Sequence, residues 1–491
     1  MAPRNLLVIM MDELTREGLG CYGGLGLTPN IDKLAAQGTR FEQAYTPSPI
    51  CVPARACFQS GRYVFQNRCW SNAQPYRGRP EGWAHRLKAE GHETVSIGKL
   101  HYGSSADDNG YAREVLPLHV TGGDGWVYGL LRRQDHTAFD CAGFAAAIGP
   151  GEDPYSDYDR RVRDAAVDWL ETEGSRPRDK PWACFVSFVR PHYPLSCPPD
   201  FYALYDPERL PPRRFGGRRG EYRHPVVNAL RQYFDYDDHF PDERARQVAR
   251  ASYFGLCSFV DSLVGDLLGA LEASGRALDT AVVLTADHGE MNGHHGLWTK
   301  MVMYEEAVGI PLILAGAGAP RGVCQTQASL VDVHQTALEA AGLGLSTDDG
   351  ALPGRSLYAL AEGDDRDRVV LSEYHDGGSI TGITMLREGR WKYIAYAGFA
   401  PQLFDLQADP DERNDLGLSG AHVEIRARLH ARLCQEFGDP EAISARAFAD
   451  QALRIEQLGG IDAIYARDNY DHTPLEAEAD PQGQASMLAR G

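Results

Sequence analysis

The chain has 491 residues, with 49 Lys and Arg against 68 Asp and Glu, which gives a formal net charge of −19. At 43% hydrophobic and 24% charged residues, its composition is that of an ordinary globular protein, and its length predicts roughly two to three domains. The acid excess argues against nucleic acid or an anionic membrane as partner, because both bind clustered positive charge.

The N-terminal segment predicts a buried strand at Leu6–Met11 and then a helix from Thr28-Pro29 to Gly38. Between them, Gly18–Gly23 fits the pattern G-x-G-x-x-G. A dinucleotide site needs its helix to begin at that loop, so we interpret these glycines as a turn. The first apolar run is too short for a signal peptide or a membrane span, and we expect a cytoplasmic protein.

Strand-like and helix-like segments then alternate as far as residue 365. Strands are predicted at Thr94–Ile97, Trp182–Val189, Thr280–Thr285 and Ile310–Ala315, and helices at Trp83–Ala89, Tyr158–Glu173 and Ala245–Ser274. This alternation predicts an α/β fold with a large, mostly parallel sheet sandwiched by helices. Polar residues that follow the predicted strands are candidates for chemistry, because open α/β sheets place their sites at the carboxyl ends of strands. They are Asp12, Lys99, His192 and Asp287.

The pattern changes after about residue 366. Short β-like runs occur at Val369–Tyr374, Ile380–Leu386, Trp391–Tyr396 and Gln402–Asp405, followed by a helical pattern at Val423–Phe437. We interpret residues 1–365 as the catalytic domain and residues 366–470 as a smaller C-terminal subdomain with an antiparallel sheet and a helix. The polar stretch 471–491 is interpreted as a tail or as an arm of a homo-oligomer.

The most informative segment contains Cys51-Val-Pro-Ala-Arg55 followed by Gly61-Arg-Tyr63. It closely resembles the signature of the formylglycine-dependent type I sulfatases of the alkaline-phosphatase superfamily. In that family the cysteine is oxidised to formylglycine by a formylglycine-generating enzyme, which would be a transient partner here. Taken alone, the pattern is also compatible with a buried cysteine before a turn proline.

Five further motifs extend this resemblance through most of residues 5–410. In order they are Leu7–Glu13 with the helix after Thr28, Gly98-Lys99-Leu-His101, Pro191-His192-Tyr-Pro194, Asp287–Glu290 continuing to Lys300, and Leu403–Leu406 with Asp409–Glu412. Five ordered motifs at family-like spacing are very specific. The resemblance implies the alkaline-phosphatase/sulfatase fold and hydrolysis of a sulfate ester to an alcohol and inorganic sulfate.

The resemblance also implies a metal site built from Asp12, Glu13, Asp287, His288 and the modified side chain at Cys51. Carboxylate oxygens suit Ca²⁺, and the imidazole makes Mn²⁺ the alternative. Family members commonly carry Asp or Gln at the position of Glu13. An acid that does not touch the metal is therefore the other interpretation of Glu13.

A sulfate ester carries negative charge that Arg55, Lys99, Lys300 and the metal would balance. By the resemblance, one hydroxyl of the formylglycine hydrate attacks sulfur and expels the alcohol. His101 then deprotonates the second hydroxyl, so that the aldehyde re-forms and inorganic sulfate leaves. Either His192 or Lys300 would protonate the leaving oxygen.

Within the family, the chain is most similar to the choline-sulfatase-like branch. The segments that carry this similarity are Trp70–Ala73, Gly98–Tyr102, Asp124–Trp126, Ser372–Tyr374 and Ile383–Arg387. It implies that Asn72 lies near the transferred group, while Trp126 and Glu373 face a quaternary ammonium. We therefore expect a small-molecule ester, either choline sulfate or a related alkyl or aryl sulfate. The structural alternatives are a core position for Trp126 and a solvated strand edge for Glu373.

Two other functions stay open at this point. A phosphonate monoester or phosphodiester hydrolase of the same superfamily would use the same metal and formylglycine, although a glycine in place of Val52 would be more typical of it. A relative that binds metal and anion without turnover would result if Cys51 stays a thiol.

Overall fold

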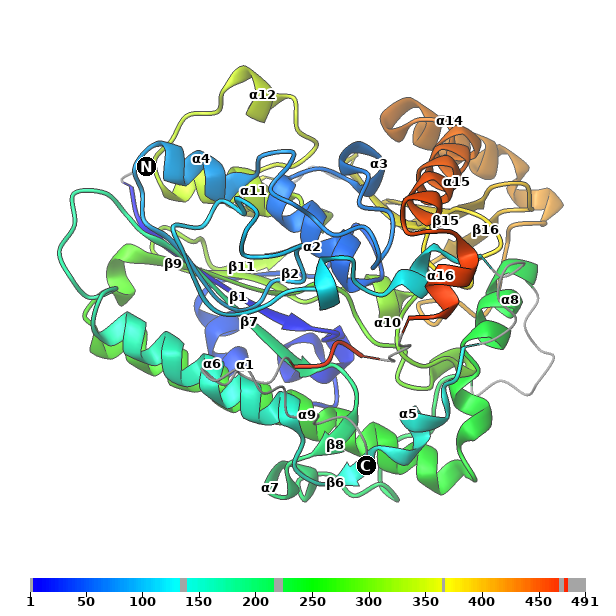
Figure 1. The fold of residues 1–491 in the computed structure, drawn as a ribbon, viewed down its shortest axis with the longest axis horizontal. Helices are drawn as coiled ribbons and strands as arrows, with labels where there is room; N and C mark the ends of the chain where they lie inside the picture. The colour runs from blue at the N-terminus through cyan, green and yellow to red at the C-terminus, as the bar shows by residue number, and fades with distance from the viewer. Residues whose placement is uncertain (1–2, 133–138, 216–223, 364–366, 468–471, 476–491) are drawn as a thin grey trace.

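The structure is a computed structural model, and it describes residues 3–132, 139–215, 224–363, 367–467 and 472–475. Its centre is an eight-stranded sheet with the strand order β11-β2-β10-β9-β1-β7-β4-β5 (Figure 1). In chain order, these strands are β1 (Asn5–Asp12), β2 (Thr39–Phe41), β4 (Thr94–Lys99), β5 (Arg113–Leu118), β7 (Ala183–Pro191), β9 (Thr280–Ala286), β10 (Leu312–Gly316) and β11 (Gly322–Cys324).

The middle of the sheet is parallel, as the sequence predicts. Strand β1 pairs in parallel with β7 and β9, and β4 pairs in parallel with β7 and β5. Every residue of β1, β7 and β9 is buried, which explains why apolar residues follow one another in these strands instead of standing only at alternate positions. Strand β10 is antiparallel to β9 and β2, so the sheet is mixed at this side.

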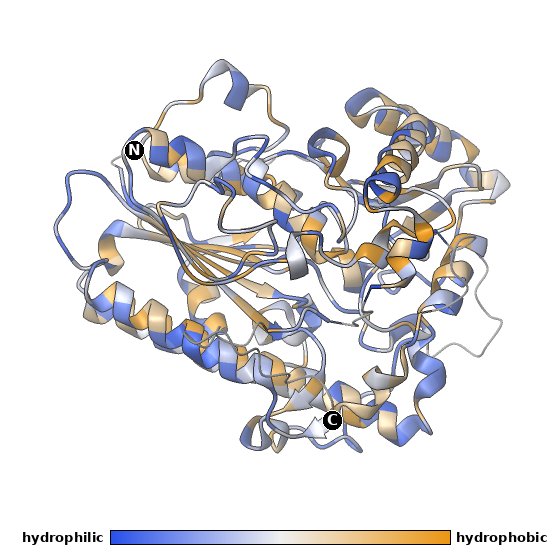
Figure 2. Cartoon of the chain, viewed as in Figure 1, coloured by the Kyte–Doolittle hydropathy of each residue, from blue (hydrophilic) through white to orange (hydrophobic). Residues whose placement is uncertain are grey.

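Helices cover both faces of the sheet (Figure 1). On one face lie α1 (Pro29–Gln37), α6 (Pro154–Glu171) and α9 (Glu243–Ala273), and on the other lie α2 (Cys51–Ser60), α4 (Trp83–Ala89) and α11 (Asp332–Ala340). Figure 2 shows the apolar sheet enclosed between helices with polar outer surfaces. The predicted sandwich is therefore confirmed. Helix α9 is long and apolar enough to cross a membrane, but 72% of its most apolar window is buried inside the protein, as in the core helix of a globular fold.

The glycine-rich segment before α1 forms a turn, as predicted. It contains two short 3₁₀ turns, Arg16–Gly18 and Gly20–Tyr22, and α1 begins only at Pro29. Thr28 precedes the helix but does not cap it: its hydroxyl oxygen accepts a hydrogen bond from the Gly20 amide instead.

The C-terminal part contains the predicted four-stranded antiparallel sheet, formed by β13 (Val369–Tyr374), β14 (Ile383–Glu388), β15 (Trp391–Tyr396) and β16 (Gln402–Asp405). It is covered by the predicted helix α14 (Val423–Phe437) and by α15 (Pro440–Gln457), which was not predicted from the sequence. Helix α16 (Ile461–Tyr465), also not predicted, packs against α15 and the Val127–Leu130 segment. Helix α15 has a readable start signal, since the Asp439 side chain caps it and Pro440 is its first residue. Strand β13 contacts the segment before Cys51, because the Glu373 amide donates to the Pro47 carbonyl.

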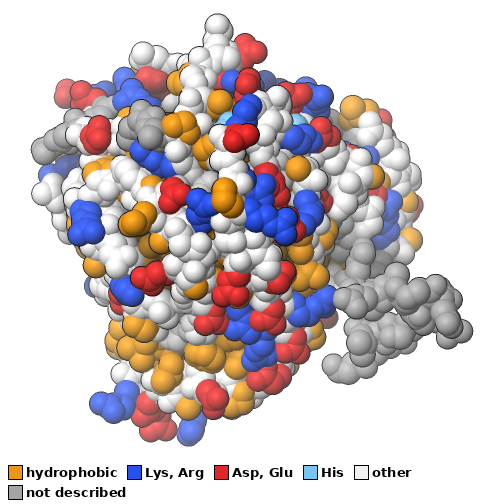
Figure 3. All heavy atoms as spheres, turned by 90° about the vertical axis from the view of Figure 1, so that its left-hand side faces the viewer, with side chains coloured by type: hydrophobic (Ala, Val, Ile, Leu, Met, Phe, Trp, Pro, Cys, Tyr) orange, Lys and Arg blue, Asp and Glu red, His pale blue; other side chains and the backbone are white. Residues whose placement is uncertain are grey.

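The remaining α-helices and β-strands are short. They are β3 (Ala44–Tyr45), α3 (Val64–Asn67), α5 (Ala142–Ala146), β6 (Ile148–Pro150), β8 (Leu195–Cys197), α7 (Pro199–Tyr202), α8 (Pro225–Tyr233), α10 (Glu305–Val308), β12 (Ala328–Ser329), α12 (Thr347–Gly350) and α13 (Leu357–Glu362). On the face that lies at the left of Figure 1, acidic and basic side chains are interspersed (Figure 3).

Candidate active site

The candidate site lies where the central parallel strands end. Asp12 ends β1, Lys99 ends β4, and Asp287 directly follows β9. Cys51 is the first residue of α2, and Pro53 stands in the first turn of that helix, where a missing amide hydrogen costs no intrahelical bond. The side chains of Asp12, Cys51, Lys99 and Asp287 are all buried. The fold thus assembles at one point residues that are up to 275 positions apart in the sequence.

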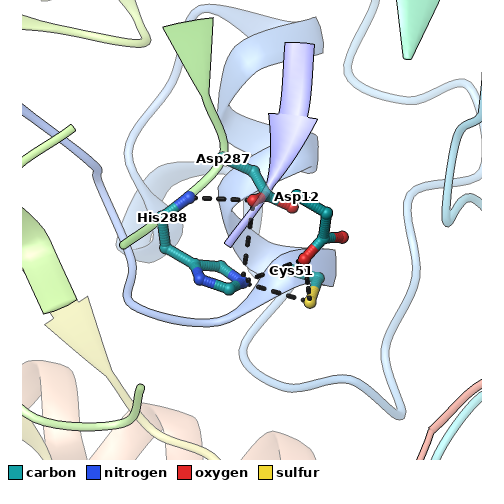
Figure 4. Close-up of side chains that lie close together, drawn as sticks. All are labelled: Asp12, Cys51, Asp287 and His288. Carbon is teal, nitrogen blue, oxygen red and sulfur yellow. Dashed lines mark hydrogen bonds and ion pairs between the residues drawn. The ribbon is translucent and has the colours of Figure 1, made fainter. Parts of the chain in front are cut away.

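Four side chains point toward one another at this point: Asp12, Cys51, Asp287 and His288 (Figure 4). Their potential ligand atoms all lie within 4.8 Å of one another. Cys51 Sγ lies 3.6 Å from Asp12 Oδ1 and 3.2 Å from His288 Nε2. This sulfur stands where the oxygen of a formylglycine would be.

The orientation of His288 suits a metal ligand. Its Nδ1 lies 3.0 Å from the Gly289 carbonyl, and because a carbonyl only accepts, Nδ1 carries the proton. Nε2 therefore presents its lone pair to Asp12, Cys51 and Asp287. An imidazole held in this way by a backbone carbonyl is the usual arrangement of a metal-bound histidine. Two carboxylates and this imidazole fit a divalent cation.

Two buried cations hold the carboxylates in place. Arg55 Nε lies 2.7 Å from Asp287 Oδ2 and Arg55 Nη2 lies 3.3 Å from Asp12 Oδ2, while Lys99 Nζ lies 2.5 Å from Asp12 Oδ2. Burial alone would raise the pKa of Asp12, but Lys99 and the neighbouring cationic groups outweigh it and lower that pKa well below its usual value. Asp12 is therefore a carboxylate, ready to bind a cation.

The structure places Glu13 in a second group, with Asp12 and His192, rather than with Asp287 and His288. Glu13 Oε2 lies 2.8 Å from Lys300 Nζ and 3.3 Å from His192 Nε2. Burial raises the pKa of Glu13 well above its usual value despite the nearby Lys300 ammonium. In this arrangement Glu13 positions Lys300, and its role as a metal ligand stays a prediction.

The other candidate side chains line one pocket together with Cys51. From the sequence prediction these are Asn72, Lys99, His101, Trp126, His192 and Lys300. The carbonyl oxygen of the Asn72 side chain accepts a hydrogen bond from the Val52 amide at 3.0 Å, which fixes Asn72 next to residue 51. Arg55 does not line the pocket, and it acts from behind through Asp12 and Asp287.

Glu373 lies outside this pocket. Its carboxylate is fully buried and accepts a hydrogen bond from the Phe65 amide at 3.1 Å, and it also lies 3.3 Å from His375 Nε2. The solvated strand edge considered for Glu373 is therefore wrong. The described pocket lining contains no carboxylate, so Glu373 is not brought to face a substrate ammonium.

Much of the pocket wall is formed by residues that were not predicted from the sequence. The additional lining residues include Phe139, Tyr193, Phe234, Tyr236, His472 and Thr473. Only Tyr193 stands inside a recognised motif. Phe139 and Phe234 come from irregular segments, and Tyr236 begins a one-turn 3₁₀ helix, so no periodicity shows which way these side chains point. These aromatic residues are recognised as part of the pocket wall from their burial in the tertiary structure and not from their spacing in the sequence.

Comparison with known proteins agrees with this geometry. A family model described as "Sulfatase" matches residues 4–343, and one described as "N-sulphoglucosamine sulphohydrolase, C-terminal" matches residues 293–438. The chain belongs to the sulfatase family. It is a sulfuric ester hydrolase, as the sequence analysis predicts.

Individual relatives cover between 79% and 96% of the sulfatase chain. A choline-sulfatase of Rhizobium meliloti (strain 1021) is 30% identical over 485 residues, covering 96% of this chain and 94% of that protein. Arylsulfatase K of Danio rerio is 29% identical over 420 residues, covering 79% and 75%. The crystal structure of a phosphonate monoester hydrolase of Agrobacterium radiobacter superposes with a TM-score of 0.70 at 21% identity, covering 88% of this chain and 95% of that one. At that identity the structural likeness shows the fold alone.

Proposed function

We propose that this sulfatase hydrolyses a small alkyl or aryl sulfate ester, with choline sulfate as the first candidate. A formylglycine at position 51 would supply the attacking oxygen, and one divalent cation, Ca²⁺ by its oxygen ligands, would supply positive charge. The observation that carries the proposal is the pocket itself, which joins a cationic end at Cys51 to an aromatic wall.

The cationic end suits a sulfate group. Lys99 and Lys300 both line the pocket beside Cys51, and both ammonium groups are buried. Lys300 Nζ lies 2.8 Å from Glu13 Oε2, which holds this side chain at the pocket wall. Its ammonium group can bind the nonbridging oxygens of a sulfate in a site with little water.

The aromatic end suits an apolar or quaternary ammonium group. The Trp126 ring centroid lies 5.3 Å from that of Phe139 and 6.2 Å from that of Phe234, so three rings form one wall. A trimethylammonium group has no hydrogen-bond donors and binds the faces of aromatic rings. The space in this pocket that the centre of a water molecule can reach is only about 60 Å³, so its walls lie close together.

His101 suits the role of base. Burial, followed by Lys99 and Arg55, lowers the pKa of His101 well below its usual value, so the imidazole is neutral and can accept a proton. His192 has its Nδ1 2.6 Å from the Tyr193 carbonyl, which leaves Nε2 to face Glu13 and the pocket. His192 and Lys300 both remain candidates for protonating the leaving oxygen. Lys300 can donate directly as an ammonium, whereas His192 can donate from Nε2 only as an imidazolium, because its Nδ1 proton faces the Tyr193 carbonyl.

We expect choline sulfate to be hydrolysed with a kcat/KM about tenfold above that of its neutral isostere, in which carbon replaces the quaternary nitrogen. Trp126→Leu should remove most of this preference, because it keeps apolar volume but loses the ring face. Steady-state kinetics on both esters measures the ratio. Trp391→Leu, a partly buried tryptophan outside the pocket, is the control and should keep the preference.

Equal kcat/KM values for the two esters would show that the pocket does not recognise a cation. The pocket would then be an apolar one for other alkyl or aryl sulfates. If phenyl phosphonate esters were hydrolysed faster than any sulfate ester tested, the phosphonate hydrolase alternative would replace the proposal.

The proton donor is identified by the leaving group. An alkoxide needs a proton to leave, whereas nitrophenolate does not. We expect alanine at the donor, His192 or Lys300, to lower kcat/KM for choline sulfate by about 10²–10³-fold and for nitrophenyl sulfate by less than about tenfold. The alanine variant at the residue that is not the donor should lower kcat/KM for both esters by the same factor. If both variants lower the rates on both esters to the same extent, neither residue is the proton donor.

A further inference from the structure

Residues 472–475 of the C-terminal segment lie at the catalytic pocket of the same chain. His472 and Thr473 belong to the pocket lining, and Leu475 packs against the main hydrophobic core. Figure 1 shows this stretch as a short red segment beside the tips of β1 and β7. The sequence analysis interpreted the region from residue 471 onward only as a tail or an oligomer arm.

Tyr155, in the first turn of α6, holds this segment. Its hydroxyl donates to the Thr473 carbonyl, and its ring centroid lies 5.4 Å from that of His472. The centroid of the same Tyr155 ring lies 6.3 Å from that of His192, which lines the pocket. The segment is thus attached to a buried residue of the catalytic domain that also contacts the active site.

The contact with chemical consequences is between Thr473 and His101. Thr473 Oγ1 lies 2.9 Å from His101 Nε2. His101 is 5% exposed, and its Nδ1 has no hydrogen-bond partner among the described residues. A proton on Nδ1 would therefore be a buried donor without an acceptor, whereas a proton on Nε2 can be donated to Thr473.

We infer that Thr473 is a positioning residue, which holds the Nε2 proton of His101 and leaves the Nδ1 lone pair as the base. This inference rests on the proposed function. In the step that releases sulfate, Nδ1 takes the proton of the free hydroxyl at position 51. The electron pair of that O–H bond forms the carbonyl, the bond from the same carbon to the sulfate oxygen breaks, and sulfate leaves with that electron pair. His101 ends as an imidazolium. Its Nε2 proton is donated to Thr473, and the proton taken from the hydroxyl is on Nδ1.

The kinetic test uses Thr473→Val, which keeps the shape of the side chain but removes its hydroxyl, with Thr473→Ser as the variant that restores it. With nitrophenyl sulfate, a slower second step lowers kcat by about tenfold and KM by the same factor, so kcat/KM is unchanged. Nitrophenol then appears in a pre-steady-state burst. Thr473→Ser should behave as the wild type. A raised KM, a reduced kcat/KM or an unchanged kcat in Thr473→Val would each overturn the inference.

A second test does not depend on turnover. Diethyl pyrocarbonate modifies neutral imidazole nitrogens, and mass spectrometry locates the product. We expect His101 to react several-fold faster in Thr473→Val and in a chain ended after Arg467 than in the wild type or Thr473→Ser. His92, a buried histidine bonded to the Pro181 carbonyl, should react equally in all four. Equal rates of His101 modification in the wild type and in the shortened chain would show that Thr473 does not protect the His101 ring. If the wild type hydrolyses no sulfate ester, the proposed function is wrong. The modification rates would still test whether Thr473 holds His101.

Discussion

Cys51→Ala is expected to lower kcat for sulfate esters by at least about 10⁴-fold, because it removes the atom that attacks sulfur while leaving the binding groups in place. Cys51 lies 3.2 Å from His288 and lines the pocket at its cationic end. The variant is expected to fold, with a melting temperature within a few degrees of the wild type, since alanine suits the first turn of α2.

Cys57→Ala is the matched control. Cys57 is buried on the same helix but does not line the pocket, so its loss should leave kcat unchanged. The mass of the peptide that contains Cys51, measured in protein from its native host, should show an aldehyde in place of the thiol. Substantial turnover by Cys51→Ala would end the formylglycine mechanism. An active wild type with an unmodified thiol at position 51 would end it as well.

His288→Ala is expected to lower both metal occupancy and turnover by at least about 100-fold at limiting metal. The change removes one ligand but, unlike a change at Asp12 or Asp287, leaves no buried Arg55 or Lys99 charge without its partner. Metal content by mass spectrometry and kcat/KM across a Ca²⁺ titration measure the effect. High Ca²⁺ should restore part of the turnover.

His92→Ala serves as the control for loss of a buried histidine. It also bonds to a backbone carbonyl but lies outside the two groups that could hold a metal. If His288→Ala keeps full metal content and full turnover, the cluster of Asp12, Cys51, Asp287 and His288 is not the metal site. Restoration by Mn²⁺ but not by Ca²⁺ would show instead that the metal is Mn²⁺.

The pattern of strands allowed the fold and part of the site to be predicted. Strands that are apolar along their whole length, such as Leu6–Met11, are expected only where both faces of a sheet are covered, and β1 is buried at every residue. Asp12, Lys99 and Asp287 end or follow such strands, and parallel strands end at one edge, so their convergence was predictable. Ordered motifs supplied Cys51, His101, His192 and Lys300, and all four line the same pocket.

Other assignments depended on the direction in which a side chain points, and the spacing of residues in the sequence does not determine that direction. The resemblance implies the same role for Glu373 and Trp126, but Trp126 lines the pocket, whereas the Glu373 carboxylate accepts a hydrogen bond from the Phe65 amide outside it. On a strand such as β13, alternate residues face opposite sides, and the pattern alone does not say which side meets the site. Glu13, with φ of 66°, likewise turns toward Lys300 rather than toward Asp287 and His288.

Local sequence is enough to specify the α/β class, the strand ends that carry charge, and membership of the sulfatase family, because each depends on periodicity or on motifs a few residues long. The aromatic wall of Trp126, Phe139 and Phe234, and the contact of Thr473 with His101, appear only when segments far apart in the chain pack together. Their positions follow from burial against neighbours that no local pattern encodes. These long-range contacts are also the ones proposed to select the alcohol and orient the base.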